Sequence, residues 1–218
     1  MSKQALAWTA AIALVIAFVS ALAFDRSIAE AVRHFGIESA AVVVRLRESL
    51  DVLTGSFLAR SYSGIGQLLL GATLIAIGLV WLVAQRTNLT ARALIFTGLV
   101  QICTIEAGAF LKGVFGRLRP FQLLEHNDWS HIWFAGGNSF PSGHVAFFWG
   151  LFLPLLYLYP KYRAPLLVVP VFIAFARIDE NVHFLSDVLG SIALAAIITL
   201  LAAVVFGRWI QPATTRKS

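Results

Sequence analysis

Three short stretches of the sequence place basic residues, histidines and a carboxylate at spacings that suit the binding of phosphate. In the first stretch, Lys112 and Arg119 stand seven residues apart, which is two helical turns. Both side chains can therefore lie on one face of a helix that Pro120 ends. Basic residues that snorkel at the end of a membrane helix give the same pattern, so this stretch alone leaves both interpretations open.

The second stretch is Pro141-Ser142-Gly143-His144. Pro141 suits the first turn of a helix, where the amides of Ser142, Gly143 and His144 would have no partner within the helix. A helix start of this kind attracts anions, and Gly143 lets a ligand come close to the backbone. Pro-Ser-Gly also forms ordinary turns, so this stretch too has a plainer interpretation.

The third stretch contains Arg177, His183 and Asp187. His183 and Asp187 are four residues apart, so one helical turn brings them onto one face, where the carboxylate can hold the imidazole in a single tautomer. Asp187 also opens an apolar run, and the positive end of that helix favours its ionised form. A solvated surface pair would have the same spacing.

The three stretches indicate one chemistry when they are combined. Lys112, Arg119 and Arg177 place three positive charges beside an apolar slab, and burying them without an anion is costly. Two guanidinium groups suit the oxygens of a phosphate dianion. We therefore predict His183 as a nucleophile and His144 as the acid that protonates the leaving oxygen. Since no cysteine and histidine cluster has zinc spacing, fixed cations and helix amides would stabilise the transition state without a metal ion.

In order and spacing, these stretches resemble the three-part signature of the type 2 phosphatidic acid phosphatase superfamily: Lys112-x6-Arg119-Pro120, then Pro141-Ser142-Gly143-His144, then Arg177-x5-His183-x3-Asp187. Three linked motifs are far more specific than any one of them. The signature region, residues 112–187, is about a third of the chain, and a six-span helical architecture extends the resemblance to nearly all of it.

The resemblance implies a two-step reaction without a cofactor. His183 would take the phosphoryl group as phosphohistidine with the support of Asp187, and His144 would act as acid and then activate water. The resemblance assigns phosphate binding to five residues, namely Lys112, Arg119, Ser142, Gly143 and Arg177. Ala176 departs from the family pattern, which usually has serine before the arginine, so we expect a weaker or redistributed grip on phosphate.

The elements that position these residues are apolar helices. The chain has 218 residues, of which 59% are hydrophobic and only 13% are charged. The apolar residues collect in blocks, and a helix needs roughly 20 such residues to cross a bilayer. We predict one all-α domain over residues 1–218, a polytopic bundle of six transmembrane helices: Ala5–Phe24, Ile65–Ala84, Ala91–Leu111, Gly143–Tyr159, Pro165–Ala176 and Val188–Val205. The fifth block is short and contains prolines, so it is either a tilted span that recesses Arg177 or a re-entrant segment.

The basic residues predict which side each loop faces. Six spans put both termini on one side, together with eight basic residues and no acidic one: Lys3, Arg86, Arg92, Lys161, Arg163, Arg208, Arg216 and Lys217. The positive-inside rule makes this side cytoplasmic. We therefore expect an integral protein of the bacterial inner membrane with all three phosphate-binding stretches on the periplasmic side. The net charge of +6 follows from this topology, so we do not expect nucleic acid as a partner.

Two segments near the N-terminus need separate treatment. Ala21-Leu22-Ala23 resembles a signal-peptidase site, but the apolar run before it is longer than a usual signal sequence, which favours a retained anchor. In the first outer loop, Asp25 can cap a short helix that bears Ile28, Val32 and Phe35. A second amphipathic run spans residues 38–53, and both helices would lie at the membrane interface.

The lipid that carries the phosphate stays open. The resemblance suggests undecaprenyl pyrophosphate, phosphatidylglycerol phosphate or phosphatidic acid, with a lipid A 1-phosphatase or lipid A phosphotransferase as the alternative. A transporter with an anion site would not need the pair of His183 and Asp187 or the second histidine, His144. Vanadate-dependent peroxidase chemistry does not suit the membrane helices. Further polar residues are open as well: Glu106 is either functional or a neutral packing residue, and His126, Asp128 and His131 are either near a head group or solvated.

Overall fold

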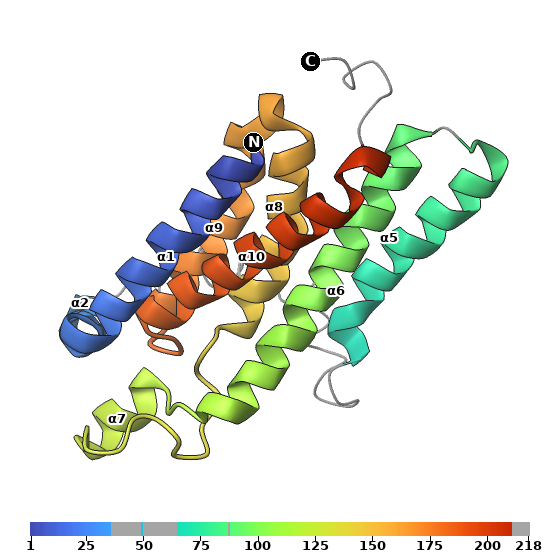
Figure 1. Ribbon diagram of the computed structural model, residues 1–218. Coiled ribbons are helices and arrows are strands. Elements are labelled where there is room, and N and C mark those ends of the chain that lie inside the picture. The colour runs from blue at the N-terminus through green and yellow to red at the C-terminus, as the bar shows by residue number, and fades with distance from the viewer. Residues whose placement is uncertain (36–48, 50–64, 87, 211–218) are drawn as a thin grey trace.

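The computed structural model describes residues 1–35, 49, 65–86 and 88–210. Over these ranges it is helical without strands, as predicted. The main elements follow the apolar blocks of the sequence (Figure 1): α1 (Lys3–Ala23), α2 (Asp25–Phe35), α5 (Ile65–Ala84), α6 (Leu89–Phe115), α7 (Pro120–His126), α8 (Gly143–Leu158), the 3₁₀ turn η1 (Pro160–Tyr162), α9 (Arg163–Asp179) and α10 (Leu185–Ile210).

All six predicted apolar blocks form helices, and four of these helices are long and apolar enough to cross a membrane, namely α1, α5, α6 and α10. The other two are shorter, with 16 residues in α8 and 17 in α9. Both continue through an internal proline, Pro154 in α8 and Pro170 in α9. The number of six spans therefore remains a prediction. The fifth block, which was expected to be either a tilted span or a re-entrant segment, lies within one continuous helix, α9, from Arg163 to Asp179.

The bundle is centred on α10, which packs against α1, α6 and α8. Outside this centre, α5 packs on α6 and α9 packs on α8. The side of α1 that faces α10 carries small residues such as Ala10, Ala13 and Ala17, which let the two helices approach closely.

The outward surface of the bundle is apolar. Phe18 on α1, Val83 on α5 and Val205 on α10 are exposed to 67%, 83% and 71%. Many large apolar side chains lie on the outside of the bundle, and its core is apolar as well. A surface in contact with lipid has this character. The bundle therefore has the surface of an integral membrane protein.

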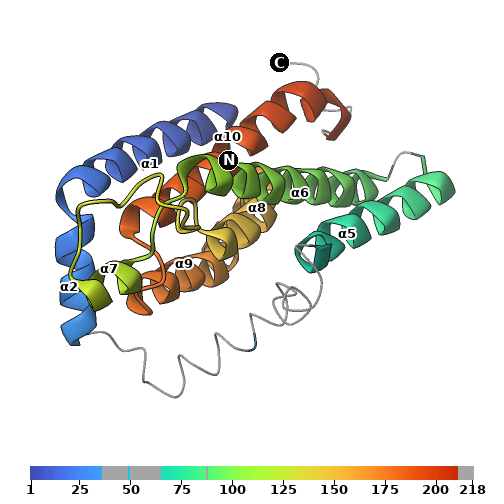
Figure 2. The same ribbon diagram turned by 90° about the horizontal axis from the view of Figure 1, so that it is seen from below.

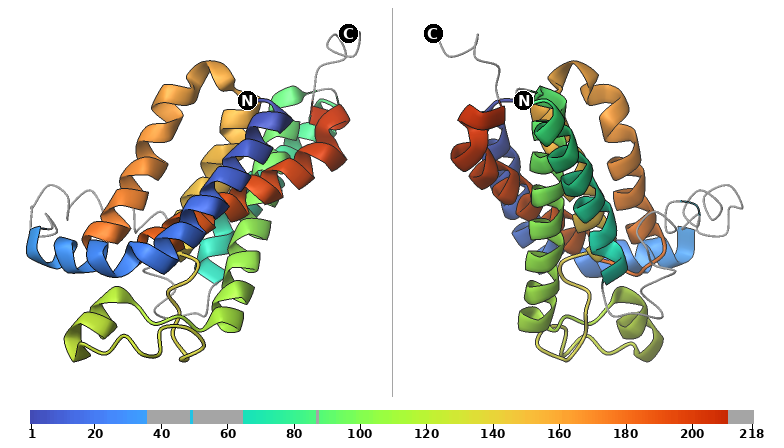
Figure 3. Two further views of the ribbon diagram at one scale, coloured as in Figure 1. Left: turned by 60° about the vertical axis from the view of Figure 1, so that its left-hand side comes forward. Right: turned by 90° about the vertical axis from the view of Figure 1, so that its right-hand side faces the viewer.

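The chain alternates between two ends of the bundle (Figures 1 and 3). One end, here called the basic end, carries Lys3, Arg92, Lys161 and Arg208 at the helix termini. It is tied together by contacts such as the bond from Arg92 Nη1 to the Trp209 carbonyl oxygen, at 2.8 Å. The grouping of these basic residues agrees with the predicted topology, while the orientation in the membrane stays a prediction.

The opposite end, here called the site end, carries α2, α7 and the turn between α9 and α10 (Figure 2). There α2 lies across the end of the bundle and contacts α7, α9 and α10. The expected helix after Asp25 is confirmed, but Asp25 is the buried first residue of α2, and its carboxylate bonds to other elements instead of capping the helix. The second amphipathic run, at residues 38–53, lies outside the described residues apart from residue 49.

Candidate functional site

The three predicted stretches meet at the site end. Ser142, which precedes α8, donates its amide to the carbonyl oxygen of Asp187 in the first turn of α10, at 3.3 Å. Lys112 from the last turn of α6 lies beside Gly143, because a Cβ built on that glycine would lie 3.6 Å from Lys112 Cε. The His183 amide bonds to the Arg177 carbonyl oxygen at 3.1 Å. Segments far apart in the sequence thus converge on one place.

Lys112 and Arg119 converge through a loop, and not along one helix as predicted. Helix α6 ends at Phe115 because Gly116 adopts a left-handed conformation with φ of 48°, which glycine tolerates. Arg119 instead precedes α7, and Pro120 begins that helix. The two side chains come together on Asn138, since Lys112 Nζ donates to its carbonyl oxygen at 2.6 Å and Arg119 Nε to its Oδ1 at 3.0 Å.

The start of α8 differs in detail from the prediction. Helix α8 begins at Gly143, so Pro141 stands before the helix and not in its first turn. The Ser142 amide is occupied by Asp187, whereas the fully buried Ser142 hydroxyl has no partner among the described residues. His144 is the second residue of α8 and half-buried. The helix start therefore presents amides and one hydroxyl where an anion can accept hydrogen bonds.

His183 and Asp187 meet at the start of α10, although they do not share a helix. His183 lies in the turn before α10, and its Nδ1 is 3.5 Å from Asp187 Oδ2. The ring is 4% exposed. Burial lowers the pKa of His183 to about 4, and the charges of Lys112 and Arg119 act in the same direction, against the opposing effect of Asp187. The imidazole is therefore neutral near pH 7, as a nitrogen nucleophile must be.

Asp187 is held by several donors. Its Oδ2 accepts from the Ser139 hydroxyl at 2.5 Å and from the Phe184 amide at 2.9 Å. Its Oδ1 accepts from Arg117 Nη1 at 2.5 Å. Because both oxygens of the carboxylate are held, Asp187 faces the Nδ1 side of the His183 ring in one orientation, and Nε2 is the ring nitrogen on the side away from it.

Four residues of this network were not predicted from the sequence as site residues: Asp25, Arg117, Asn138 and Ser139. Arg117 stands inside the first stretch, between Lys112 and Arg119, and that position was the one available signal. Asn138 and Ser139 lie two to three residues before Pro141, outside the second stretch, so only the fold of the loop reveals what they bond.

Arg177 is buried in the last turn of α9, 7% exposed, with Nη1 3.2 Å from Glu180 Oε2. It also lies close enough to Arg119 for the two charges to repel. Ala176 beside it is fully buried. Its methyl group is therefore packed inside the protein at the position where the family pattern has serine. Among the residues that the structure describes, Arg177 thus already has a carboxylate beside it, that of Glu180.

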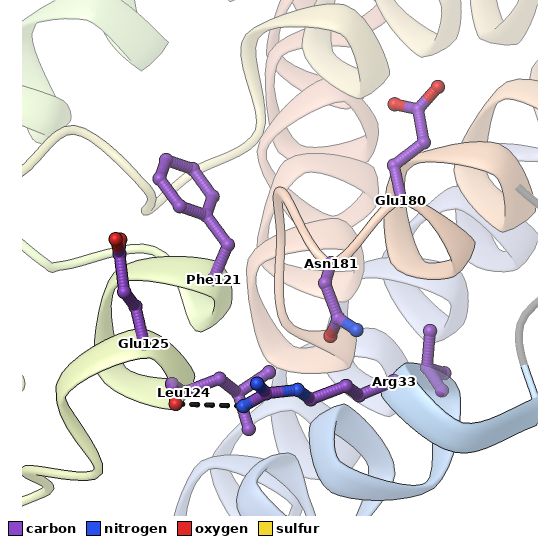
Figure 4. Close-up of a pocket in the computed structure, with 7 residues that line it drawn as sticks. Arg33, Phe121, Leu124, Glu125, Glu180 and Asn181 are labelled. Carbon is purple, nitrogen blue, oxygen red and sulfur yellow. Dashed lines mark hydrogen bonds between the residues drawn. The ribbon is translucent and has the colours of Figure 1, made fainter.

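A pocket of about 360 Å³ lies between α2 and α7, and one of the residues that line it, Glu180, pairs with Arg177. In Figure 4, Phe121 and Glu125 of α7 lie across from Glu180 and Asn181, and Arg33 reaches from α2 to the Leu124 carbonyl oxygen, at 2.8 Å. The pocket is therefore polar on several sides with one aromatic ring at its edge.

The other polar residues singled out from the sequence lie away from this cluster. Glu106 is exposed on the outside of α6, which argues against the packing role considered for it. His126 and His131 are exposed, and Asp128 accepts from the amide and hydroxyl of Ser130. Among the described residues, no group of three or more His, Cys, Asp or Glu side chains is arranged to hold a metal ion.

Comparisons with known proteins bear on the same region. A family model described as the PAP2 superfamily matches residues 87–211. A lipid A 1-phosphatase of Rhizobium johnstonii is 33% identical over 101 residues, which are 45% of this chain and 41% of that protein. A lipid A 1-phosphatase of Rhizobium etli is 31% identical over 101 residues, 45% of this chain and 44% of that protein. The matched part is thus less than half of each relative's length, and no solved structure matches the chain.

Proposed function

Because the chain belongs to the PAP2 superfamily, we propose that it is a membrane-embedded lipid phosphatase whose nucleophile is His183. The observation that supports this proposal most is the environment of that ring. It is buried and neutral, it faces a fixed carboxylate on its Nδ1 side, and it lies within the field of two cations. A histidine with only a packing role needs no such cations.

The proposed reaction has two steps. His183 Nε2 attacks the phosphorus, the bond from phosphorus to the lipid oxygen breaks, and His144 donates a proton to that leaving oxygen. In the second step His144 takes a proton from water, whose oxygen displaces His183 and releases inorganic phosphate. Asp187 stabilises the positive charge that the imidazole carries while it is phosphorylated.

The phosphate would be bound by the cations and by the start of α8. Lys112, Arg119 and Arg177 neutralise its oxygens, while the Ser142 hydroxyl and the Gly143 amide donate hydrogen bonds. The buried Ser142 hydroxyl has no hydrogen-bond partner among the described residues, which supports this role, since a bound anion would satisfy it. We propose that these groups stabilise the transition state without a metal ion.

The proposed substrate is a glycolipid phosphate of the lipid A class. Two relatives carry the name lipid A 1-phosphatase. The pocket between α2 and α7 adds a physical reason, because Phe121, Glu125 and Asn181 offer a ring face, a carboxylate and an amide to a hydroxyl-rich head group. Glu180 lines the pocket and pairs with Arg177, so we propose that the head group occupies the pocket while its phosphate is bound by the cations.

This proposal can be tested by measuring phosphate release from a panel of lipid phosphates. The assay uses the purified protein in the presence of a metal chelator. We expect phosphate release from the 1-phosphate of lipid A to exceed release from phosphatidic acid, phosphatidylglycerol phosphate and undecaprenyl pyrophosphate. Vanadate should inhibit the reaction. Phe121→Ala should raise KM for the glycolipid more than for phosphatidic acid.

Each failure of this experiment has a separate meaning. Release that requires a divalent metal contradicts the metal-free mechanism, and a preference for another lipid contradicts the substrate assignment alone. Lipid binding without phosphate release, under all conditions, would favour a transporter over an enzyme.

A further inference from the structure

Arg117 is a deeply buried charged group at the site end. It is 1% exposed, and its carbon Cζ lies 4.2 Å from the ring centre of Trp133 and 4.1 Å from that of Phe184. The two rings enclose the guanidinium and fix its plane. Nη1 donates to Asp187 at 2.5 Å and to the Ser186 hydroxyl at 2.6 Å. Arg117 therefore bonds the carboxylate of Asp187, which lies beside His183, and the two rings hold the guanidinium in one orientation.

A second carboxylate, that of Asp25, occupies the other side of the same guanidinium. Arg117 Nη2 donates to Asp25 Oδ2 at 2.7 Å, and Asp25 is 5% exposed. Asp25 also accepts from Ser20 Oγ at 2.6 Å and from the Ser186 amide at 3.2 Å, and it bonds the Ser186 hydroxyl. It comes from the junction of α1 and α2, outside residues 87–211, where the family model matches.

The charges in this cluster do not cancel. Two carboxylates and one guanidinium leave one negative charge, and Asp187 presents it to the Nδ1 side of His183. Arg117 paired with Asp187 alone would be neutral overall and would draw the carboxylate charge away from the ring. A buried charge acts strongly because little solvent screens it. The surplus negative charge therefore favours the state in which His183 carries a phosphoryl group and a positive charge.

We propose that Asp25 and Arg117 are positioning residues for phosphoryl transfer, which hold Asp187 against His183 and keep the cluster negative beside that ring. This inference rests on the proposed function, because it needs His183 as nucleophile. Arg117 fixes the orientation of Asp187, and Asp25 offsets the charge of Arg117. Neither residue touches the substrate, so both act through Asp187.

A double-mutant cycle in the full-length protein tests this inference. The variants are Asp25→Asn, Asp187→Asn and the pair combined, with Glu30→Gln as matched control because it removes another carboxylate of α2 whose partner, Arg26, is exposed. The measured quantities are kcat and KM for lipid A 1-phosphate, corrected for the folded fraction. Arg117→Lys is compared with Arg117→Met to see whether a charge restores activity.

We expect Asp25→Asn to lower kcat on the order of 10-fold with little change in KM, the scale typical of groups that orient a catalytic residue. The same substitution should have almost no effect in the Asp187→Asn background, and Arg117→Lys should keep more activity than Arg117→Met. An unchanged kcat per folded molecule in Asp25→Asn, or equal losses in both backgrounds, would overturn the inference.

Two further variants keep the test decisive. Ser20→Ala removes one hydrogen bond to Asp25, so it replaces Asp25→Asn if that variant does not fold, and a kcat equal to that of Glu30→Gln would then count against the inference. His183→Ala separates the two proposals. Full activity in His183→Ala refutes the proposed function, whereas loss of activity there with a normal Asp25→Asn refutes the positioning role alone.

Discussion

Burial and the two nearby cations lower the pKa of His183 together. The ring is removed from water, and both Lys112 and Arg119 disfavour its protonation, while Asp187 opposes them from the Nδ1 side. The result is an imidazole that stays neutral, yet has a carboxylate ready to stabilise the charge that arises on phosphorylation. At the scale of single residues, this combination distinguishes the proposed nucleophile from an ordinary buried histidine.

The protonation of His183 is the first prediction. Its pKa is lowered from 6.5 to about 4, so the folded protein binds this proton only near pH 4, whereas the unfolded chain binds it near pH 6.5. The folded state should therefore lose stability as the pH falls from about 6.5 to 4. In ring-labelled protein, the His183 NMR signal should keep its neutral position down to about pH 5. The His183→Gln variant identifies the signal, and a titration midpoint near 6.5 would contradict the burial argument.

Gly143 gives a second prediction. A Cβ at this position meets only Lys112 Cε, at an ordinary contact distance of 3.6 Å, so Gly143→Ala should fold normally. The added methyl group would lie where phosphate approaches the start of α8. We expect a several-fold higher inhibition constant for vanadate with an unchanged melting temperature. An unchanged inhibition constant would mean that phosphate binds elsewhere.

The residues of the third stretch could be named from the sequence. The hydrogen bonds that Asp187 forms with Arg117 and Ser139 could not. The expected contact between His183 and Asp187 is present. Arg117 was not predicted as a site residue, because its burial between two aromatic rings depends on the fold of the loop. Asp25 stands 92 residues before Arg117, and no local pattern can reveal a contact over that separation.

At the scale of the helices, close approach between α5 and α6 depends on glycine. A Cβ on Gly98 would lie 2.5 Å from the Gly71 carbonyl oxygen, a distance that real side chains do not adopt. Small residues of this kind let membrane helices pack through their backbones. The α5–α6 pair supports the Lys112 end of the site, since Lys112 stands in the last turn of α6.

Gly98→Ala should therefore destabilise the bundle by about 1–3 kcal/mol, because the backbone of α5 must move away. Gly113→Ala on the same helix is the matched control, since a Cβ there meets nothing within 4 Å among the described residues. Thermal unfolding in detergent measures both variants. Equal melting temperatures for the two would show that the α5–α6 contact does not depend on this glycine.

Helices were easier to predict than their ends. The block Ile65–Ala84 matches α5 residue for residue, because uniform hydrophobicity marks a membrane helix clearly. The end of α6 was misplaced, since Pro120 appeared to be the stop signal while Gly116 ends the helix with a left-handed residue. A glycine without a neighbouring sequence signal can continue or end a helix, and the tertiary contacts of the loop decide which.

At the scale of the whole molecule, the two ends of the bundle differ in chemistry. The basic end carries Lys3, Arg92, Lys161 and Arg208 at helix termini, while the site end holds the mixed charges of the proposed active site. The proposed site thus lies at one end of the bundle, opposite the basic end.

This asymmetry predicts the orientation in the membrane. By the positive-inside rule the basic end faces the cytoplasm, so a reporter fused at residue 88 should be cytoplasmic and one fused at residue 128 periplasmic. Paired fusions of alkaline phosphatase and a fluorescent protein at both residues measure this in cells. Both reporters on one side would contradict the arrangement, and reversed sides would place the site in the cytoplasm.

Trapping the phosphorylated enzyme tests whether His183 takes the phosphoryl group. Purified protein would be mixed with lipid labelled in its phosphate, quenched in alkali within one turnover, digested and mapped. We expect an acid-labile, alkali-stable label on the peptide that contains His183, formed at least as fast as turnover and absent from His183→Ala. Turnover without any label, or a label on another residue, would contradict it.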